Sequence, residues 1–112
     1  MRRDYNKLVR DRIPTIICAS GKKCTVEVMA EAEYRQALLE KLVEEAHEAL
    51  QSAPGELIVE LADIQEVLVA VLAAWELSPG LVEQVQTQRR AERGGFERRL
   101  KLLWTEDGDE NA

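Results

Sequence analysis

The pattern of apolar and polar positions is most regular between residues 31 and 51. Apolar side chains recur there at the three- and four-residue spacing of one helix face: Leu39, Leu42, Val43, Ala46 and Leu50. We therefore expect a helix over residues 31–51 that turns this stripe toward the rest of the protein. Ala30, just before it, has no side chain that could cap the helix, so we expect the first turn to fray.

A second long helix is expected over residues 56–77, after a turn that contains Pro54 and Gly55. Every residue from Val67 to Trp75 is apolar, which is typical of a helix buried on most sides, although this run is too short to span a bilayer. Two helices of this size, each about 30 Å long, carry more apolar surface than one shorter helix covers. We therefore expect a homodimer or a dimer of dimers.

Shorter elements are expected on both sides of these helices. Pro14 and Gly21 predict a short helix over residues 14–20, preceded by a helical or tightly turned segment at 6–12. A third long helix is expected to begin at Ser78-Pro79 and to end at Gly94. Residues 24–28 alternate apolar and polar side chains as a strand does, and pairing with residues 96–104 would complete a short β-hairpin.

These elements predict an all-α protein, a bundle of antiparallel helices with at most a minor β-hairpin. Apolar residues make up 46% of the chain and aromatic residues only 4%, so the core must consist of aliphatic side chains, which suits packed helices. The length of 112 residues fits one domain, which we assign to residues 1–104. Residues 105–112 contain four acids and little that is apolar, and we expect a disordered acidic tail there.

Composition also narrows the location and the partners. The first residues contain no apolar run of the signal-peptide type, so we expect a cytoplasmic protein that does not bind membranes. The net charge of −6 disfavours binding to nucleic acid polymers, which depends on basic surfaces. Cys18 and Cys24 form no Cys-x-x-Cys pair and have no further ligands nearby in sequence, which favours reduced thiols over a redox motif or a zinc site.

The charges are unevenly distributed along the chain. Residues 27–66 hold eleven acidic side chains against only Arg35 and Lys41, whereas residues 1–12 and 89–101 are basic. A block of acids between two basic segments would suit a polyanion that arrives with a divalent cation.

Two pairs of acids three residues apart stand out within this block. Glu45 and Glu48 lie on the first long helix, and Glu60 and Asp63 lie on the second. Residues three apart share a helix face, and a helical hairpin brings the two pairs side by side. Since desolvated carboxylates repel one another unless they bind a cation, and oxygen ligands select hard ions, we expect the four acids to hold Mg²⁺ or Mn²⁺.

Basic residues supply candidates for contacts with phosphate. Arg89 and Arg93 are one turn apart near the end of the third long helix, where they either complement the helix dipole or grip phosphate oxygens. Lys7, Arg10 and Arg12 in the first basic segment are further candidates, with salt bridges as the alternative. His47 is expected at the surface, and Trp75 and Trp104 are open between core packing and base stacking.

Two groups of motifs resemble a known family. The stretch Glu44-Glu45-Ala46-His47-Glu48 followed by Glu60-Leu61-Ala62-Asp63 resembles the signature of the all-α NTP pyrophosphatase, or MazG-like, superfamily. The stretches Tyr5-Asn6-Lys7-Leu8-Val9-Arg10-Asp11-Arg12-Ile13-Pro14 and Arg93-Gly94-Gly95-Phe96-Glu97 resemble its short single-domain branch, whose members are predicted to remove noncanonical nucleotides.

This resemblance implies an enzyme in which Glu45, Glu48, Glu60 and Asp63 bind Mg²⁺. An activated water would hydrolyse a nucleoside triphosphate to the monophosphate and pyrophosphate, with Glu44 or Glu48 as the general base. A related enzyme acting on phosphoribosyl-ATP is one alternative. A helical dimerisation module without catalysis is the other.

Overall fold

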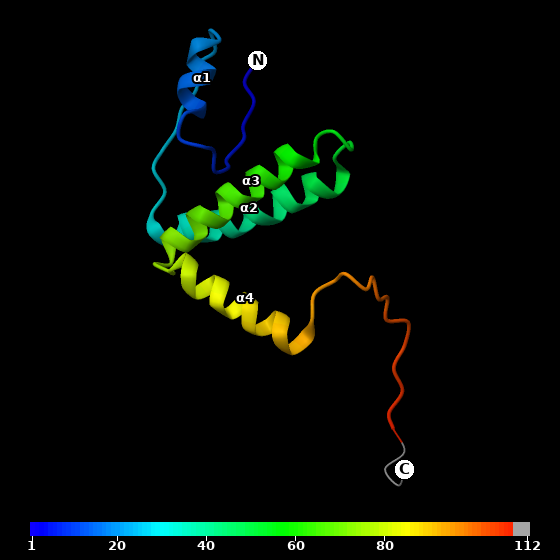
Figure 1. Ribbon diagram of the computed structural model, residues 1–112. Coiled ribbons are helices and arrows are strands. Elements are labelled where there is room, and N and C mark those ends of the chain that lie inside the picture. The colour runs from blue at the N-terminus through cyan, green and yellow to red at the C-terminus, as the bar shows by residue number, and fades with distance from the viewer. Residues whose placement is uncertain (109–112) are drawn as a thin grey trace. The chain divides into compact units, whose positions relative to one another are not determined.

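The computed structural model describes residues 1–108, and all its regular structure is helical (Figure 1). The helices are α1 (Ile13–Ala19), α2 (Glu31–Gln51), α3 (Leu57–Ala74) and α4 (Pro79–Arg93). The expected all-α class is confirmed. No strand occurs in residues 1–108, so the expected β-hairpin is wrong. Val26 and Val28 are 62% and 100% exposed, and an alternating pattern becomes a strand only where a partner strand and a buried face support it.

The chain divides into two compact units, residues 1–78 and residues 79 onward. The first unit contains α1, α2 and α3. The second contains α4 and the irregular segment that follows it. The span expected as one domain, residues 1–104, covers both units, and the expected acidic tail lies partly outside the described residues.

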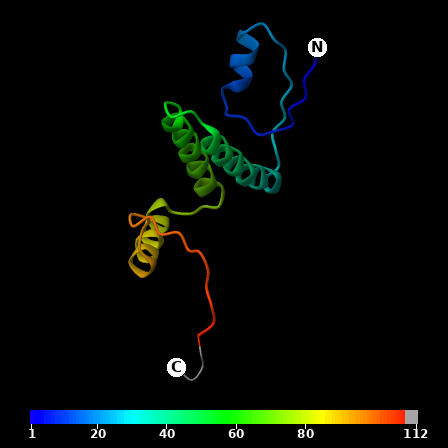
Figure 2. The same ribbon diagram turned by 90° about the vertical axis from the view of Figure 1, so that its right-hand side faces the viewer.

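Helices α2 and α3 form an antiparallel hairpin and lie side by side in both ribbon views (Figures 1 and 2). Helix α2 has the predicted bounds, and no side chain caps it at Ala30, as expected. The hairpin turn follows Ser52, whose hydroxyl donates a 2.8 Å hydrogen bond to the Ala49 carbonyl at the end of α2. Because the turn is short, acids near the end of α2 face acids near the start of α3.

The face that α2 turns toward α3 differs from the expected stripe. Leu38 and Val67 are the only buried apolar side chains among residues 1–108, with 3% and 8% of their surfaces exposed. Val43 and Leu50, which belong to the expected stripe, are 70% and 81% exposed. Glu45, seven residues after Leu38, lies on the same face because seven residues make almost two helical turns. The buried face of α2 therefore includes a carboxylate, while much of its apolar stripe remains exposed.

Helix α3 ends at Ala74, earlier than the predicted residue 77. The Arg35 side chain of α2 donates hydrogen bonds of 3.1 and 2.8 Å to the Ala74 carbonyl. The same guanidinium lies over the Trp75 ring, 5.4 Å from the ring centroid. A positively charged group at a helix C-terminus satisfies free carbonyls and complements the helix dipole. Arg35 thus fastens the first half of α2 to the end of α3 and gives Trp75 a structural role.

Helix α1 begins one residue before its predicted start, and Gly21 follows it with a φ of 88°. Of the two alternatives for residues 6–12, the helical one is not observed. The segment is irregular and ends in a turn closed by a 3.0 Å hydrogen bond from the Ile13 N–H to the Arg10 carbonyl.

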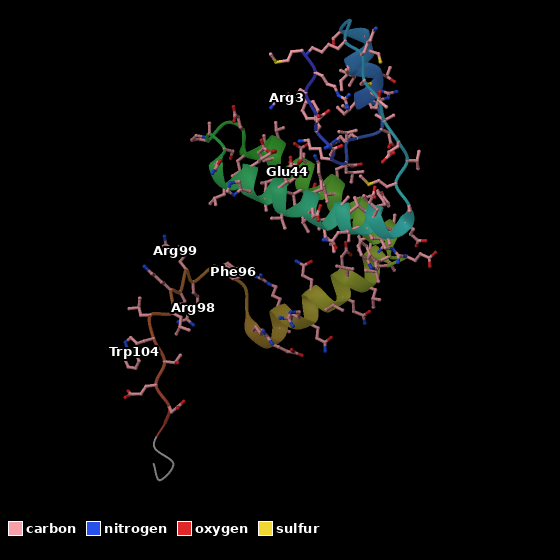
Figure 3. The ribbon with its side chains drawn as sticks, turned by 180° about the vertical axis from the view of Figure 1, so that it is seen from behind. Arg3, Glu44, Phe96, Arg98, Arg99 and Trp104 are labelled. Carbon is pink, nitrogen blue, oxygen red and sulfur yellow. The ribbon has the colours of Figure 1, made fainter. Side chains whose placement is uncertain are left out.

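The second unit begins with α4, whose predicted start and glycine end are confirmed. Gly94 has a φ of 82°, and its N–H donates a 2.7 Å hydrogen bond to the Arg90 carbonyl. In the segment after α4, the side chains of Phe96 and Trp104 are 95% and 72% exposed (Figure 3). Trp104 is therefore outside any core of the described residues. No helix in residues 1–108 combines the length and the apolar character that a membrane crossing requires.

Candidate metal centre

Three of the four expected ligands meet where α2 faces α3. Glu45 from α2 and Glu60 and Asp63 from α3 each offer one carboxylate oxygen, and these oxygens lie within 4.8 Å of one another. Glu60 and Asp63 share a face of α3 because they are three residues apart. Glu48 does not belong to this group of three, and its side chain is exposed.

Two oxygens of this cluster are buried without a partner. Only 7% of the surface of Glu45 is exposed. Its Oε2 atom and the Oε2 atom of Glu60 have no hydrogen-bond partner among the described residues. Burying a polar atom without a hydrogen bond costs free energy, so such atoms are rare in folded proteins. A cation bound by this cluster would satisfy both acceptors.

The surroundings make both glutamates hold protons more tightly than usual. Burial raises the pKa of Glu45, and the nearby Glu48 carboxyl raises it further, while Lys41 opposes this increase. Burial also raises the pKa of Glu60, and the negative charges of Glu48 and Asp63 add to the effect. A divalent cation would reverse this balance, because its charge favours the ionised carboxylates. Because the Glu48 charge raises the pKa of both glutamates, Glu48 lies close to them although it is outside the cluster.

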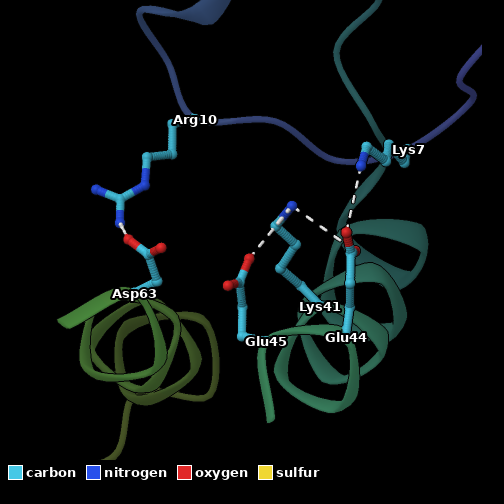
Figure 4. Close-up of polar contacts among 6 residues, drawn as sticks. All are labelled: Lys7, Arg10, Lys41, Glu44, Glu45 and Asp63. Carbon is cyan, nitrogen blue, oxygen red and sulfur yellow. Dashed lines mark hydrogen bonds and ion pairs between the residues drawn. The ribbon is translucent and has the colours of Figure 1, made fainter. Parts of the chain in front are cut away.

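The N-terminal segment brings two predicted phosphate ligands to this centre (Figure 4). The Arg10 guanidinium donates a 2.7 Å hydrogen bond to Asp63 Oδ1, and the Lys7 ammonium donates one of 3.2 Å to Glu44 Oε1. Both residues thus form salt bridges, the alternative left open by the sequence, and contact with phosphate stays a prediction. Lys41 adds positive charge at 3.7 Å from carboxylate oxygens of both Glu44 and Glu45.

A cleft of about 470 Å³ lies beside the centre, because Lys41, which lines the cleft, is 3.7 Å from Glu45 of the cluster. Residues of the N-terminal segment, the segment before α2 and the first half of α2 line it: Asn6, Lys7, Glu27, Met29, Glu33, Gln36, Ala37, Glu40, Lys41 and Glu44. Its charged lining is mainly acidic. No sequence signal marked this cleft, because its walls come from three segments whose contacts are not periodic.

The remaining candidate residues lie on α4 and on the exposed face of α2. Arg89 and Arg93 lie on α4 in the second unit, so their contact with phosphate stays a prediction. Arg90, between them, forms the ion pair of that helix end: it donates a hydrogen bond to Glu97 and lowers the pKa of that carboxyl. His47 is exposed, as expected.

Comparisons of the chain with protein-family models, curated proteins and solved structures found no match. The family named above remains a resemblance carried by the quoted motifs.

Proposed function

We propose that this protein is a cytoplasmic, Mg²⁺-dependent hydrolase that converts a nucleoside triphosphate, of a noncanonical kind, to the monophosphate and pyrophosphate. The observation that carries this proposal is the cluster of Glu45, Glu60 and Asp63, with its two buried and unpartnered carboxylate oxygens. Hard divalent cations prefer oxygen ligands, so the donor set fits Mg²⁺, and Mn²⁺ is the alternative. The bound ion would neutralise phosphate charge and lower the pKa of a water molecule.

We assign the general base to Glu48 rather than Glu44. Glu44 is held by two ammonium groups, Lys7 at 3.2 Å and Lys41 at 3.7 Å. Among the described residues, no cation lies within ion-pair distance of Glu48. Its carboxyl is exposed and lies close to both Glu45 and Glu60. A carboxylate beside the metal ligands that is free of ion pairs is available to contact a water molecule bound to the cation.

The remaining surroundings suggest how the substrate lies. Lys7 and Arg10, at the centre, are suited to hold phosphate oxygens. Arg89 and Arg93, on α4 of the second unit, stay candidates from the sequence alone. Lys7 lies at the border of the cleft, whose further carboxylate and amide groups would accept hydrogen bonds from the nucleoside. The substrate would therefore place its phosphates over the acids of α2 and α3 and its nucleoside in the cleft.

A homodimer, or a dimer of dimers, belongs to the same proposal. Ile58 and Val59 on α3 are 75% and 57% exposed, and Val43 and Leu50 on α2 are 70% and 81% exposed. Large exposed apolar side chains on two neighbouring helices favour a protein–protein contact. Light scattering at micromolar protein tests this proposal, and a monomer of 12.7 kDa would contradict it.

The test of function is pyrophosphate release from a panel of canonical and modified nucleoside triphosphates and phosphoribosyl-ATP, with Mg²⁺ and with EDTA. We expect metal-dependent release that the Glu45→Gln, Glu60→Gln and Asp63→Asn variants lose while they keep their helicity. Hydrolysis in ¹⁸O-labelled water should put the label in the monophosphate, because water attacks the α phosphorus. Orthophosphate as the labelled product would contradict the bond assignment. No turnover of any substrate would favour a non-catalytic helical module.

A further inference from the structure

Two thiols outside the metal centre lie against each other. Cys18 is in the last turn of α1, and Cys24 follows it in the segment that leads to α2. Their sulfur atoms are 3.8 Å apart, and both residues are free and exposed to solvent. The distance corresponds to van der Waals contact, and a disulfide bond requires the sulfur atoms to approach to about 2.05 Å.

A turn after Cys18, and a contact of 3.8 Å from the Cys24 thiol to the Pro14 carbonyl at the start of α1, keep the two cysteines near each other. Gly21 turns the chain with a φ of 88°, a conformation that favours glycine. Its N–H donates a 3.1 Å hydrogen bond to the Cys18 carbonyl, and the Ser20 hydroxyl donates one of 2.6 Å to the Ile17 carbonyl. The turn therefore brings the sulfurs together in the reduced protein, and little chain entropy remains to be lost when they are joined.

We propose that Cys18 and Cys24 form a reversible redox site that low-molecular-weight disulfides, such as oxidised glutathione, convert to an intrachain disulfide. One protein thiolate attacks a glutathione sulfur, forms a mixed disulfide and releases one glutathione. The second protein thiolate then attacks the protein sulfur of the mixed disulfide and releases the other glutathione. The protein loses two electrons and two protons, and oxidised glutathione takes them up to become two thiols.

The two thiols also influence each other, and positive charge lies next to them in the sequence. A hydrogen bond with Cys18 is the main cause that raises the pKa of the Cys24 thiol, and burial and the Cys18 charge add to it. Lys22 and Lys23 precede Cys24 and provide positive charge that attracts the anionic carboxylates of glutathione.

The disulfide would connect two segments that line the cleft. Glu27 and Met29, shortly after Cys24, belong to one part of the cleft lining, and Asn6 and Lys7, shortly before α1, belong to another. Joining α1 to residue 24 restricts the separation of these segments. The dithiol site thus links the oxidation state of the solution to the freedom of the cleft, and it does not depend on the proposed hydrolase activity.

The test is to treat the full chain with oxidised glutathione, block free thiols by alkylation, and digest it with trypsin without reduction. We expect cleavage after Lys22 or Lys23 to leave the peptide with Cys18 and the peptide with Cys24 joined by a disulfide, and dithiothreitol to separate them. Either single variant, Cys18→Ser or Cys24→Ser, should instead keep one glutathione on its remaining cysteine, because no second thiol can displace it.

The competing outcomes are distinct in the same mass spectra. Wild-type protein that retains glutathione on either cysteine, or forms disulfides between chains, would overturn the proposal. So would alkylation of both thiols after treatment that oxidises a control dithiol peptide. Both cysteines are exposed, so serine variants are expected to fold, and the wild-type result decides even if they do not.

Discussion

Replacing Glu45 by Gln should change metal-free stability and metal response in opposite directions. The substitution keeps the size of the side chain and removes one negative charge from the cluster on α2 and α3. In wild-type protein without metal, Glu45 lies within 4.8 Å of two other carboxylates and 3.7 Å from one ammonium group, that of Lys41. Without metal, the variant should therefore be the more stable protein.

The magnitude follows from these distances. Two unit charges 4.8 Å apart repel by about 3.5 kcal/mol at an effective dielectric constant of about 20. The attraction to Lys41 at 3.7 Å is about 4.5 kcal/mol on the same scale. Two repulsions thus exceed the one attraction by about 2.5 kcal/mol, and partial protonation and relaxation reduce this excess. We expect Glu45→Gln to stabilise the metal-free protein by about 1 kcal/mol, which raises the melting temperature by about 4 °C.

Added Mg²⁺ should make wild type more stable than the Glu45→Gln variant. A ligand present at about 100 times its dissociation constant stabilises the folded state by about 2.7 kcal/mol. Wild type should gain this amount from Mg²⁺, while the variant has lost one ligand charge and should gain much less. Thermal unfolding followed by circular dichroism, in EDTA and at increasing Mg²⁺, measures both effects.

The matched control is Glu83→Gln, which removes the same charge from an exposed position on α4. It should resemble wild type with and without metal. If Glu45→Gln melts below wild type in EDTA and shows an undiminished response to Mg²⁺, the idea of a repulsive cluster relieved by a cation is wrong.

Three further predictions concern pH, the N-terminal segment and the end of α3. Folding raises the pKa of Glu45 above its ordinary 4.5, so the contribution of Glu45 to stability is fully present below that pH and is lost as pH rises through the folded pKa. The stability advantage of Glu45→Gln in EDTA should therefore shrink on acidification. A constant advantage in pH-dependent melting curves would contradict this prediction. Arg10→Gln should bind Mg²⁺ several-fold more tightly in calorimetry, because the guanidinium that competes for Asp63 is gone; weaker binding would mean that Arg10 instead orients that carboxylate. Arg35→Met should lower the melting temperature by a few degrees, because about 1–2 kcal/mol of hydrogen bonding to the end of α3 is lost. An unchanged melting temperature would show that this contact does not stabilise the protein.

The sequence was most informative where a feature depends on helical spacing. Glu60 and Asp63 meet because they are three residues apart, and the short turn brings Glu45 opposite them. The same reasoning was less exact about which side chains of α2 face α3. Each residue turns a helix by about 100°, so adjacent Leu38 and Leu39 point in different directions, and both are apolar. Only contact with α3 decides between them, and the structure buries Leu38.

Features that join distant segments were not predictable in this way. Lys7 pairs with Glu44 across 37 residues, and Arg10 pairs with Asp63 across 53 residues. Charge alone does not select these partners, because many acids along α2 and α3 are equivalent in sequence. The expected hairpin failed for a related reason: residues 24–28 have the alternation of a strand but, among the described residues, no strand that pairs with them.

Because Lys7 and Arg10 form salt bridges at the centre, access to the centre should depend on the ionic strength of the buffer. Side chains in both pairs are partly exposed, between 34% and 56%. Salt screens such pairs, since the Debye length falls from about 10 Å at 0.1 M to about 3 Å at 1 M. At high ionic strength the N-terminal segment should therefore detach more often from the hairpin, while the carboxylates remain where the helices hold them. Metal titrations at low and high salt consequently sample a covered and an uncovered form of the same cluster.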